Sequence, residues 1–186
     1  NNVKFINKNL GLKNDNEHIT LEELLKDIDS ENIALQIDIE FDEWEIFDNL
    51  SIEILNKFKL INFELNFVLI DEEKLLKSQT LSPYFQGFYK NSYTKINKML
   101  IKKYDKVITN FLSNFSIVHL HANNSLKLIN HDGITFHPLL EVTFLNNTEI
   151  TKSNLYLGEL PINNLDLQNK KDREDLFNFY PFGVNI

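Results

Sequence analysis

The sequence predicts one α/β domain, residues 1–186, with a doubly wound, mostly parallel sheet and a C-terminal antiparallel strand. Apolar, β-branched runs alternate with segments of helical periodicity, which is typical of parallel strands joined by crossover helices. The last two strand-like runs follow one another without a helix between them, which predicts an antiparallel hairpin. Residues 150–186 are expected to form an irregular tail.

The first half of the chain is predicted to contain two helices and two strands. Residues 20–23, Thr-Leu-Glu-Glu, fit a capping box, so a helix is expected over 21–28. The continuous apolar run 33–39 predicts a buried strand, and a helix capped by an acidic residue is expected over 42–57. The run 60–69 predicts the second strand, with its polar residues on one face.

The second half is predicted to complete the sheet. Residues 71–88 contain loop signals, and a long helix is expected over 89–114. The third strand is predicted over 115–122, a turn at 130–133, and the antiparallel strand over 139–145. This order places the first three strands parallel to one another in one sheet, with the fourth beside the last of them.

Acidic residues stand at the carboxyl ends of the first two predicted strands. Asp38 and Glu40 are two residues apart, so they share a face of the first strand, and Glu64 holds the equivalent place on the second. Ligands of open α/β sheets bind beyond these strand ends, so the three carboxylates are candidates for a site. The structural alternative is that Asp38 binds backbone amides of the following turn and that Glu64 is an internal partner.

Histidine and asparagine side chains are candidates for the same site, because they stand at the carboxyl end of the third predicted strand. His119 and His121 share one strand face, Asn123 and Asn124 end the strand, and His137 begins the antiparallel strand that returns to the same edge. Imidazole and amide groups could orient a substrate or move its proton. A hydrogen-bonded core histidine is the commoner outcome, and a divalent metal held with neighbouring carboxylates is a further alternative.

Composition restricts the class of partner and the compartment. The net charge of −8 argues against a nucleic-acid backbone as partner. No apolar run approaches the length of a membrane span, so no membrane partner is expected. The chain has no cysteine, which favours a reducing, cytoplasmic location. An oligomer is compatible with these features.

Several short motifs, taken in order, resemble the FkbM-type family of S-adenosylmethionine-dependent methyltransferases. Thr-Leu-Glu-Glu-Leu-Leu at 20–25 is similar to a family helix, and Ile-Asp-Ile-Glu-Phe-Asp-Glu-Trp-Glu at 37–45 to a family strand end. Later segments at 119–124, 138–144 and 160–169 resemble His-x-His-x-Asn-Asn, Pro-x-x-Glu-Val-Thr-Phe and Leu-Pro-x-x-x-Leu-Asp-x-x-Asn motifs. The resemblance covers most of the chain.

The resemblance implies the C-terminal part of a Rossmann-like methyltransferase domain. It implies transfer of a methyl group to oxygen of a small-molecule or carbohydrate acceptor, with S-adenosylmethionine as donor. The catalytic residues are then expected to be Asp38, Glu40 and His121. The residues expected to bind the acceptor are Glu64, His119, Asn123, Asn124 and His137, and no metal is expected.

Two departures from the family pattern affect these expectations. The glycine that usually follows the Asp-x-Glu motif is Phe41 here. The chain's five glycines are isolated, so they cannot form the glycine-rich loop that holds the donor. We therefore expect the cofactor-binding half either upstream of Asn1 or lost, and we do not expect this chain alone to bind the donor tightly. The alternative function is a non-catalytic binding or structural domain derived from this fold, and metal-dependent hydrolysis is a third hypothesis.

Overall fold

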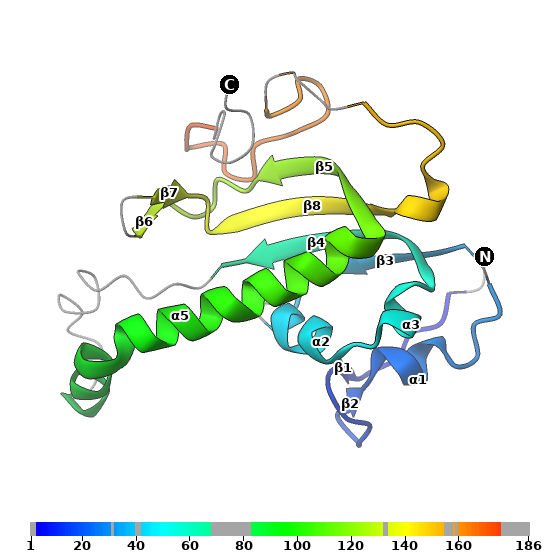
Figure 1. Cartoon of the computed structure of the whole chain (residues 1–186), viewed down its shortest axis with the longest axis horizontal. Helices are drawn as coiled ribbons and strands as arrows, with labels where there is room; N and C mark the ends of the chain where they lie inside the picture. The colour runs from blue at the N-terminus through cyan, green and yellow to red at the C-terminus, as the bar shows by residue number, and fades with distance from the viewer. Residues whose placement is uncertain are drawn as a thin grey trace.

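The protein is a mixed four-stranded sheet with helices packed against one face, seen in Figure 1. In this computed structural model, backbone and side chains are described for most of the chain. The described residues are 3–30, 32–39, 42–67, 83–131, 134–154, 158 and 160–175, of which 83–97, 129–131 and 134–136 are described by their backbone alone.

The main sheet has the strand order β3-β4-β8-β5. Its strands are β3 (Ile33–Ile37), β4 (Phe58–Asn66), β8 (Leu139–Asn146) and β5 (Phe115–Ala122). β3 and β4 are parallel, whereas β8 is antiparallel to both of its neighbours, β4 and β5. β3, β4 and β5 therefore run in one direction, and β8 runs against them.

The predicted α/β class is confirmed. The prediction of a mostly parallel sheet is wrong, because most of the strand pairs in the main sheet are antiparallel. Only one of the three ladders in the main sheet is parallel, because β8 lies between β4 and β5 and bonds to both. The common direction of the first three strands and the antiparallel strand beside β5 agree with the expectation. A complete Rossmann-like fold stays a prediction.

The helices differ from the expected ones mainly at their ends. α1 (Leu21–Leu25) has the predicted cap, since the Thr20 side chain accepts from the Glu23 amide. The single helix expected over 42–57 is two helices, α2 (Glu43–Asn49) and α3 (Ile52–Leu55), because Ser51 starts a new helix by accepting from the Ile54 amide. α5 (Pro83–Asn114) begins earlier than predicted. Its first residue is proline, a residue favoured at the first helical position.

The remaining elements are short. β1 (Asn9–Leu10) and β2 (His18–Ile19) form a parallel pair, and β6 (Ile129–His131) pairs with β7 (Ile134–Phe136). A 3₁₀ turn, η1 (Asn147–Glu149), follows β8. The turn was predicted at 130–133, and its residues 132 and 133 lie outside the described part of the chain.

The hydrophobic core lies between the sheet and the pair α2 and α5. On β4 and β8 every second side chain points into it, so Ile61, Phe63, Val142 and Phe144 are buried. Aromatic rings dominate the contact: Phe111 of α5 lies 4.8 Å from Phe144 and 5.8 Å from Phe63, centroid to centroid. This packing holds the strands in register and leaves the opposite face of the sheet for polar side chains.

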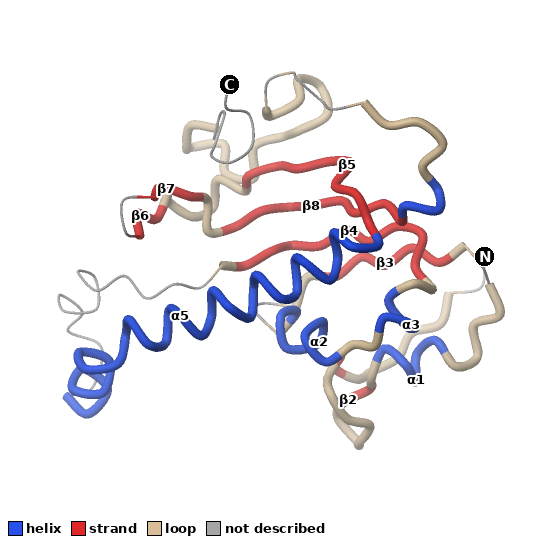
Figure 2. Tube along the Cα trace, in the orientation of Figure 1, coloured by secondary structure: helices blue, strands red, loops and turns tan. Residues whose placement is uncertain are grey.

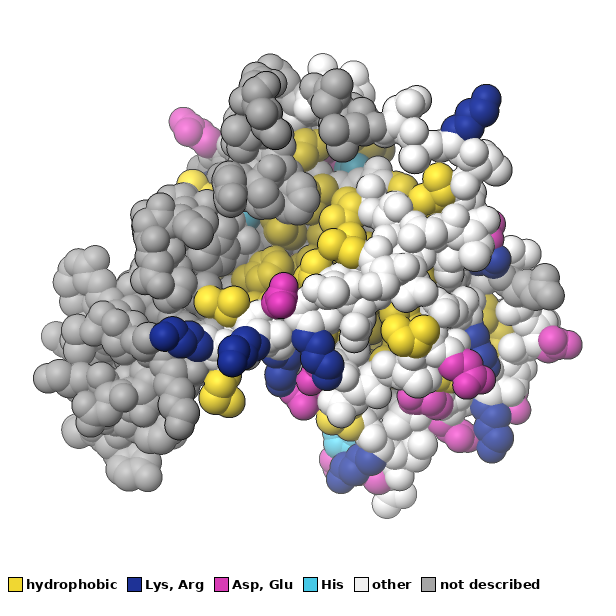
Figure 3. Space-filling view, viewed as in Figure 1, with side chains coloured by type: hydrophobic (Ala, Val, Ile, Leu, Met, Phe, Trp, Pro, Cys, Tyr) yellow, Lys and Arg dark blue, Asp and Glu magenta, His cyan; other side chains and the backbone are white. Residues whose placement is uncertain are grey.

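Ion pairs on the surface join the two helices that cover the core. Lys103 and Lys106 of α5 contact Glu45 and Asp48 of α2. Figure 3 shows Lys side chains gathered beside acidic side chains on this face. Among the described helices, none is long and apolar enough to cross a membrane.

The described part of the predicted tail is irregular, as expected, but it is bound to the sheet. Residues 160–175 run alongside β5 in Figure 2, and we call them the tail segment. Leu160 belongs to the core cluster and Ile162 packs against it.

Candidate functional site

Two rows of polar side chains cross the face of the sheet that lies opposite the helices. Strand register places Gln36, Asn62, Thr143 and His119 side by side, one from each strand. The Thr143 hydroxyl donates to Oδ1 of Asn62 at 2.9 Å. We call this side of the sheet the polar face. It follows from the strand period of two, because the residues between these positions fill the core.

The second row lies two residues away from the first row along each strand, and it carries most of the charge. Asp38 follows β3 beside Glu64, Glu64 pairs in register with Glu141, and Glu141 pairs with His121. Three carboxyl groups and one imidazole therefore stand in line across four strands. Two of them, Asp38 and Glu64, come from the carboxyl ends of neighbouring parallel strands, where the sequence predicted a site.

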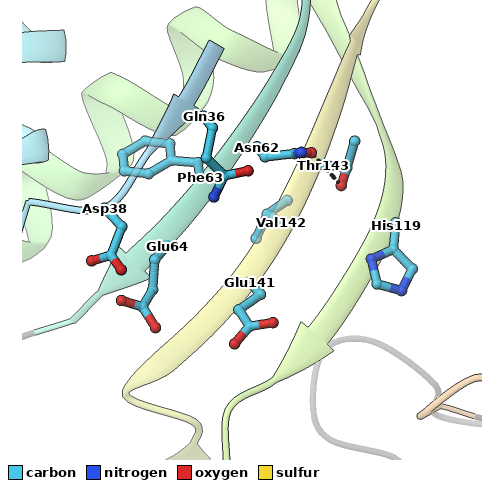
Figure 4. Close-up of a pocket in the computed structure, with 9 residues that line it drawn as sticks. All are labelled: Gln36, Asp38, Asn62, Phe63, Glu64, His119, Glu141, Val142 and Thr143. Atoms are coloured by element: carbon cyan, nitrogen blue, oxygen red, sulfur yellow. Dashed lines mark hydrogen bonds between the residues drawn. The ribbon is translucent and has the colours of Figure 1, made fainter. Parts of the chain in front are cut away.

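A cavity of about 380 Å³ lies over both rows. This volume is within the range of small-molecule sites. In Figure 4 the carboxyl groups of Asp38, Glu64 and Glu141 project toward the same side of the sheet. The cavity is lined by Gln36, Asp38, Asn62, Phe63, Glu64, His119, Glu141, Val142 and Thr143.

Glu64 has the most perturbed carboxyl group of the cavity. Burial raises its pKa, and a hydrogen bond to Asp38 and the charge of Asp38 raise it further, to about 7. The Asn123 amide opposes this shift by donating to Oε1 of Glu64 at 3.1 Å. A carboxyl group with a pKa near neutrality can both accept and release a proton under physiological conditions.

Glu141 has the opposite electrostatic environment. Its Oε2 lies 3.4 Å from Nδ1 of His121, and its Oε1 accepts from Asn169 at 2.8 Å and from Asn123 at 3.1 Å. The hydrogen bond with His121 is the largest of the effects that lower the pKa of Glu141. The same contact raises the pKa of His121 despite its burial. Glu141 is therefore ionised at neutral pH.

The two histidines of β5 are held by acidic partners. His121 is buried, and its Nε2 lies 3.9 Å from an oxygen of Asp175. His119 lines the cavity, and its Nε2 lies 2.7 Å from Oδ1 of Asp166. Among the described residues, no three His, Asp or Glu side chains are grouped so that they could hold a metal ion.

Four of the predicted residues do not line the cavity: His121 and Asn123, which contact Glu141, and also Asn124 and His137. Asn124 is buried and binds backbone groups of the tail segment, accepting from the Lys170 amide at 2.8 Å and donating to the Lys170 carbonyl at 3.0 Å. His137 is buried just before β8, and burial lowers its pKa to about 4. Glu40 lies outside the described residues.

Sequence reasoning did not select Glu141, although it lies at the centre of the second row. The signal was present, because Glu141 and Thr143 alternate with apolar residues in the run 139–145. Their side chains must share a face, and pairing with the polar residues of β4 places that face over the cavity. Asn169 was also missed, since its contact with Glu141 depends on the tertiary fold.

Comparisons with protein-family models, curated proteins and solved structures found no match for this chain. The resemblance to methyltransferases therefore depends on the motifs quoted above alone.

Proposed function

We propose that the protein is an S-adenosylmethionine-dependent methyltransferase domain that methylates oxygen of a small or sugar-like acceptor. The observation that carries this proposal is the Asp38–Glu64 pair. These residues end neighbouring parallel strands, face one cavity and interact so that the pKa of Glu64 is raised to about 7. A group of that pKa is suited to take a proton from an acceptor hydroxyl.

The proposed chemistry uses Glu64 as the general base, with Asp38 as its partner. Glu64 accepts the hydroxyl proton while the acceptor oxygen forms its bond to the methyl group. When bound, S-adenosylmethionine would supply that methyl group on a sulfonium, whose carbon–sulfur bond breaks to leave a neutral thioether. The role first expected for Asp38 thus passes to Glu64, because burial and the neighbouring charge act on Glu64.

The described residues suit one part of such a donor. The acidic row provides a favourable environment for a cationic sulfonium. The isolated glycines do not provide a loop for the rest of the donor. The antiparallel strand β8 beside β5 supports the proposal, since the resemblance implies such a strand at the C-terminal side of the sheet.

The test uses the protein at its natural length and methyl-labelled S-adenosylmethionine. It is offered to a panel of monosaccharides, oligosaccharides and small alcohols, and transfer of label is measured. Glu64→Gln should reduce transfer about a hundredfold, the usual scale for a general base. Asp38→Asn should reduce it in the same direction, and Glu53→Gln, an exposed position on α3, is the matched control.

The non-catalytic alternative is favoured by a separate observation. Two cavity-lining side chains, His119 and Glu141, are already bound by the tail segment. A domain of this kind would bind a carbohydrate without transferring label. Binding detected by saturation-transfer NMR, together with no transfer from any panel member, would replace the methyltransferase proposal by this one.

A further inference from the structure

The tail segment brings one motif of the sequence into contact with two others. Asp166 and Asn169 belong to the segment 160–169, whereas His119 and Glu141 belong to strand motifs far from it in the chain. The contacts join Asp166 to His119 at 2.7 Å and Asn169 to Glu141 at 2.8 Å. Both strand residues line the cavity. The proposed function leaves this coincidence unexplained.

The tail segment is itself built to present these side chains. Oδ2 of Asp166 accepts from the Ile162 amide, which closes the turn that contains Asn164 at a positive φ of 65°. Beyond Asn169, the backbone is fixed by the buried side chain of Asn124. Asn169 therefore lies between two anchored points of the backbone, and from there its side-chain amide donates to Glu141.

Glu141 receives hydrogen bonds from three directions and still lines the cavity. His121 belongs to β5, Asn123 follows β5 directly and Asn169 belongs to the tail segment, so two separate parts of the chain fix one carboxylate. Glu64 lies directly opposite in the antiparallel register and shares the Asn123 amide with it. Like charges directly opposite in a sheet destabilise it, so such a pair is retained only where its neighbours compensate it.

We propose that Glu141 orients the acceptor by accepting a hydrogen bond from its hydroxyl groups, and that Asn169 is the positioning residue that fixes Glu141 for this role. The inference depends on the proposed function, since it assigns a second group to the same site. It predicts an acceptor with at least two hydroxyl groups, one facing Glu64 and one facing Glu141. The distinction between the two carboxyl groups comes from their partners: Asp38 beside Glu64, and His121 and Asn169 beside Glu141.

The experiment compares Asn169→Ala and Asn169→Asp in the protein at its natural length. The pKa of Glu141 is followed by carbon-13 NMR of labelled glutamate, with the signal assigned through Glu141→Gln. Loss of the amide donor should raise this pKa, and a carboxylate at position 169 should raise it further. Asn163→Ala, at an exposed position of the same segment, is the control and should leave the pKa unchanged.

Kinetics with the acceptor found in the labelling panel separate positioning from folding. Asn169→Ala should raise the KM for the acceptor about fivefold, the scale of one hydrogen bond, with a smaller change in kcat. An unchanged pKa of Glu141, or an unchanged KM, overturns this inference alone. Absence of label transfer by the unaltered protein overturns the proposed function and, with it, the role of Glu141 toward an acceptor.

Discussion

The indole nitrogen of Trp44 donates a hydrogen bond of 2.7 Å to the carbonyl oxygen of Asn66. This contact fixes the start of α2 to the end of β4, two residues beyond Glu64. The ring is also enclosed by Tyr104 and Phe67, with centroids at 4.3 and 5.2 Å. The position of the strand end that carries Glu64 therefore depends on a buried aromatic residue on the other side of the sheet.

Trp44→Phe should reduce the free energy of unfolding by about 2 kcal/mol, because it leaves a buried carbonyl without its donor. Trp44 is the only tryptophan of the chain, so urea unfolding must be followed by circular dichroism. Phe47→Leu, in the same core, controls for simple loss of aromatic packing. A loss for Trp44→Phe below about 0.5 kcal/mol would show that the hydrogen bond contributes little.

Asn124→Ala should release the tail segment from the sheet. The substitution removes one acceptor and the donors to backbone carbonyls at Lys170, Arg173 and Glu174, all from a buried side chain. Trypsin cleaves after lysine and arginine, so cleavage within 170–173 should become at least about tenfold faster in limited proteolysis, in proportion to the population of the open segment.

The control for this prediction is Asn154→Ala, at an exposed position before the tail segment. Equal cleavage rates in Asn124→Ala and in the unaltered protein would mean that other contacts hold the segment. The hydrogen bonds of Asp166 and Asn169 are the first candidates for that role.

Glu64→Gln should make stability less dependent on pH. The pKa of Glu64 is raised to about 7 in the folded protein, so its proton is held more tightly there than in the unfolded chain. Its contribution to stability is then complete below about pH 4.5 and is lost as the pH rises through about 7. The variant should therefore melt at a higher temperature than the unaltered protein at pH 8 and at a similar temperature at pH 4. A variant that melts lower at pH 8 would contradict the assignment.

His137→Phe should show the opposite dependence on pH. Burial lowers the pKa of His137 from 6.5 to about 4, so the unfolded chain takes up its proton first as the pH falls. The stability that depends on neutral His137 is complete above about pH 6.5 and is lost as the pH falls through about 4. As the pH falls from 7 to 5, the unaltered protein loses part of this stability and the variant does not. The melting temperature of the variant should therefore rise relative to that of the unaltered protein. A constant difference would mean that His137 does not titrate differently in the two states.

Local chemistry explains why some elements could be predicted from the sequence. The Thr20 cap and the bounds of β5 follow from neighbouring residues alone, and both are confirmed. The break between α2 and α3 was missed because Ser51 looks like an ordinary helix residue until its hydroxyl accepts from Ile54. The place of β8 between β4 and β5 could not be predicted, because both edges of a strand look alike in the sequence.

In the candidate site, too, some features follow from the local sequence and others depend on the tertiary fold. That Asp38 and Glu64 would be neighbours follows from the ends of two parallel strands, and the structure places them together. The contact of Asn169 with Glu141 joins residues 28 apart in the chain through an irregular segment, for which no periodicity exists. Local patterns therefore located the carboxyl ends of the strands, whereas the partners that tune each carboxyl group came only from the folded chain.

The central place of β8 also has a consequence for biosynthesis. β4 and β5 leave the ribosome before β8, yet in the main sheet they are joined only through it. In a nascent chain that ends before residue 139, β4 and β5 therefore share no ladder. The strand edges that later pair with β8 are exposed. At translation rates of about 5–20 residues per second, these edges stay open for seconds, and they are candidates for chaperone binding during synthesis.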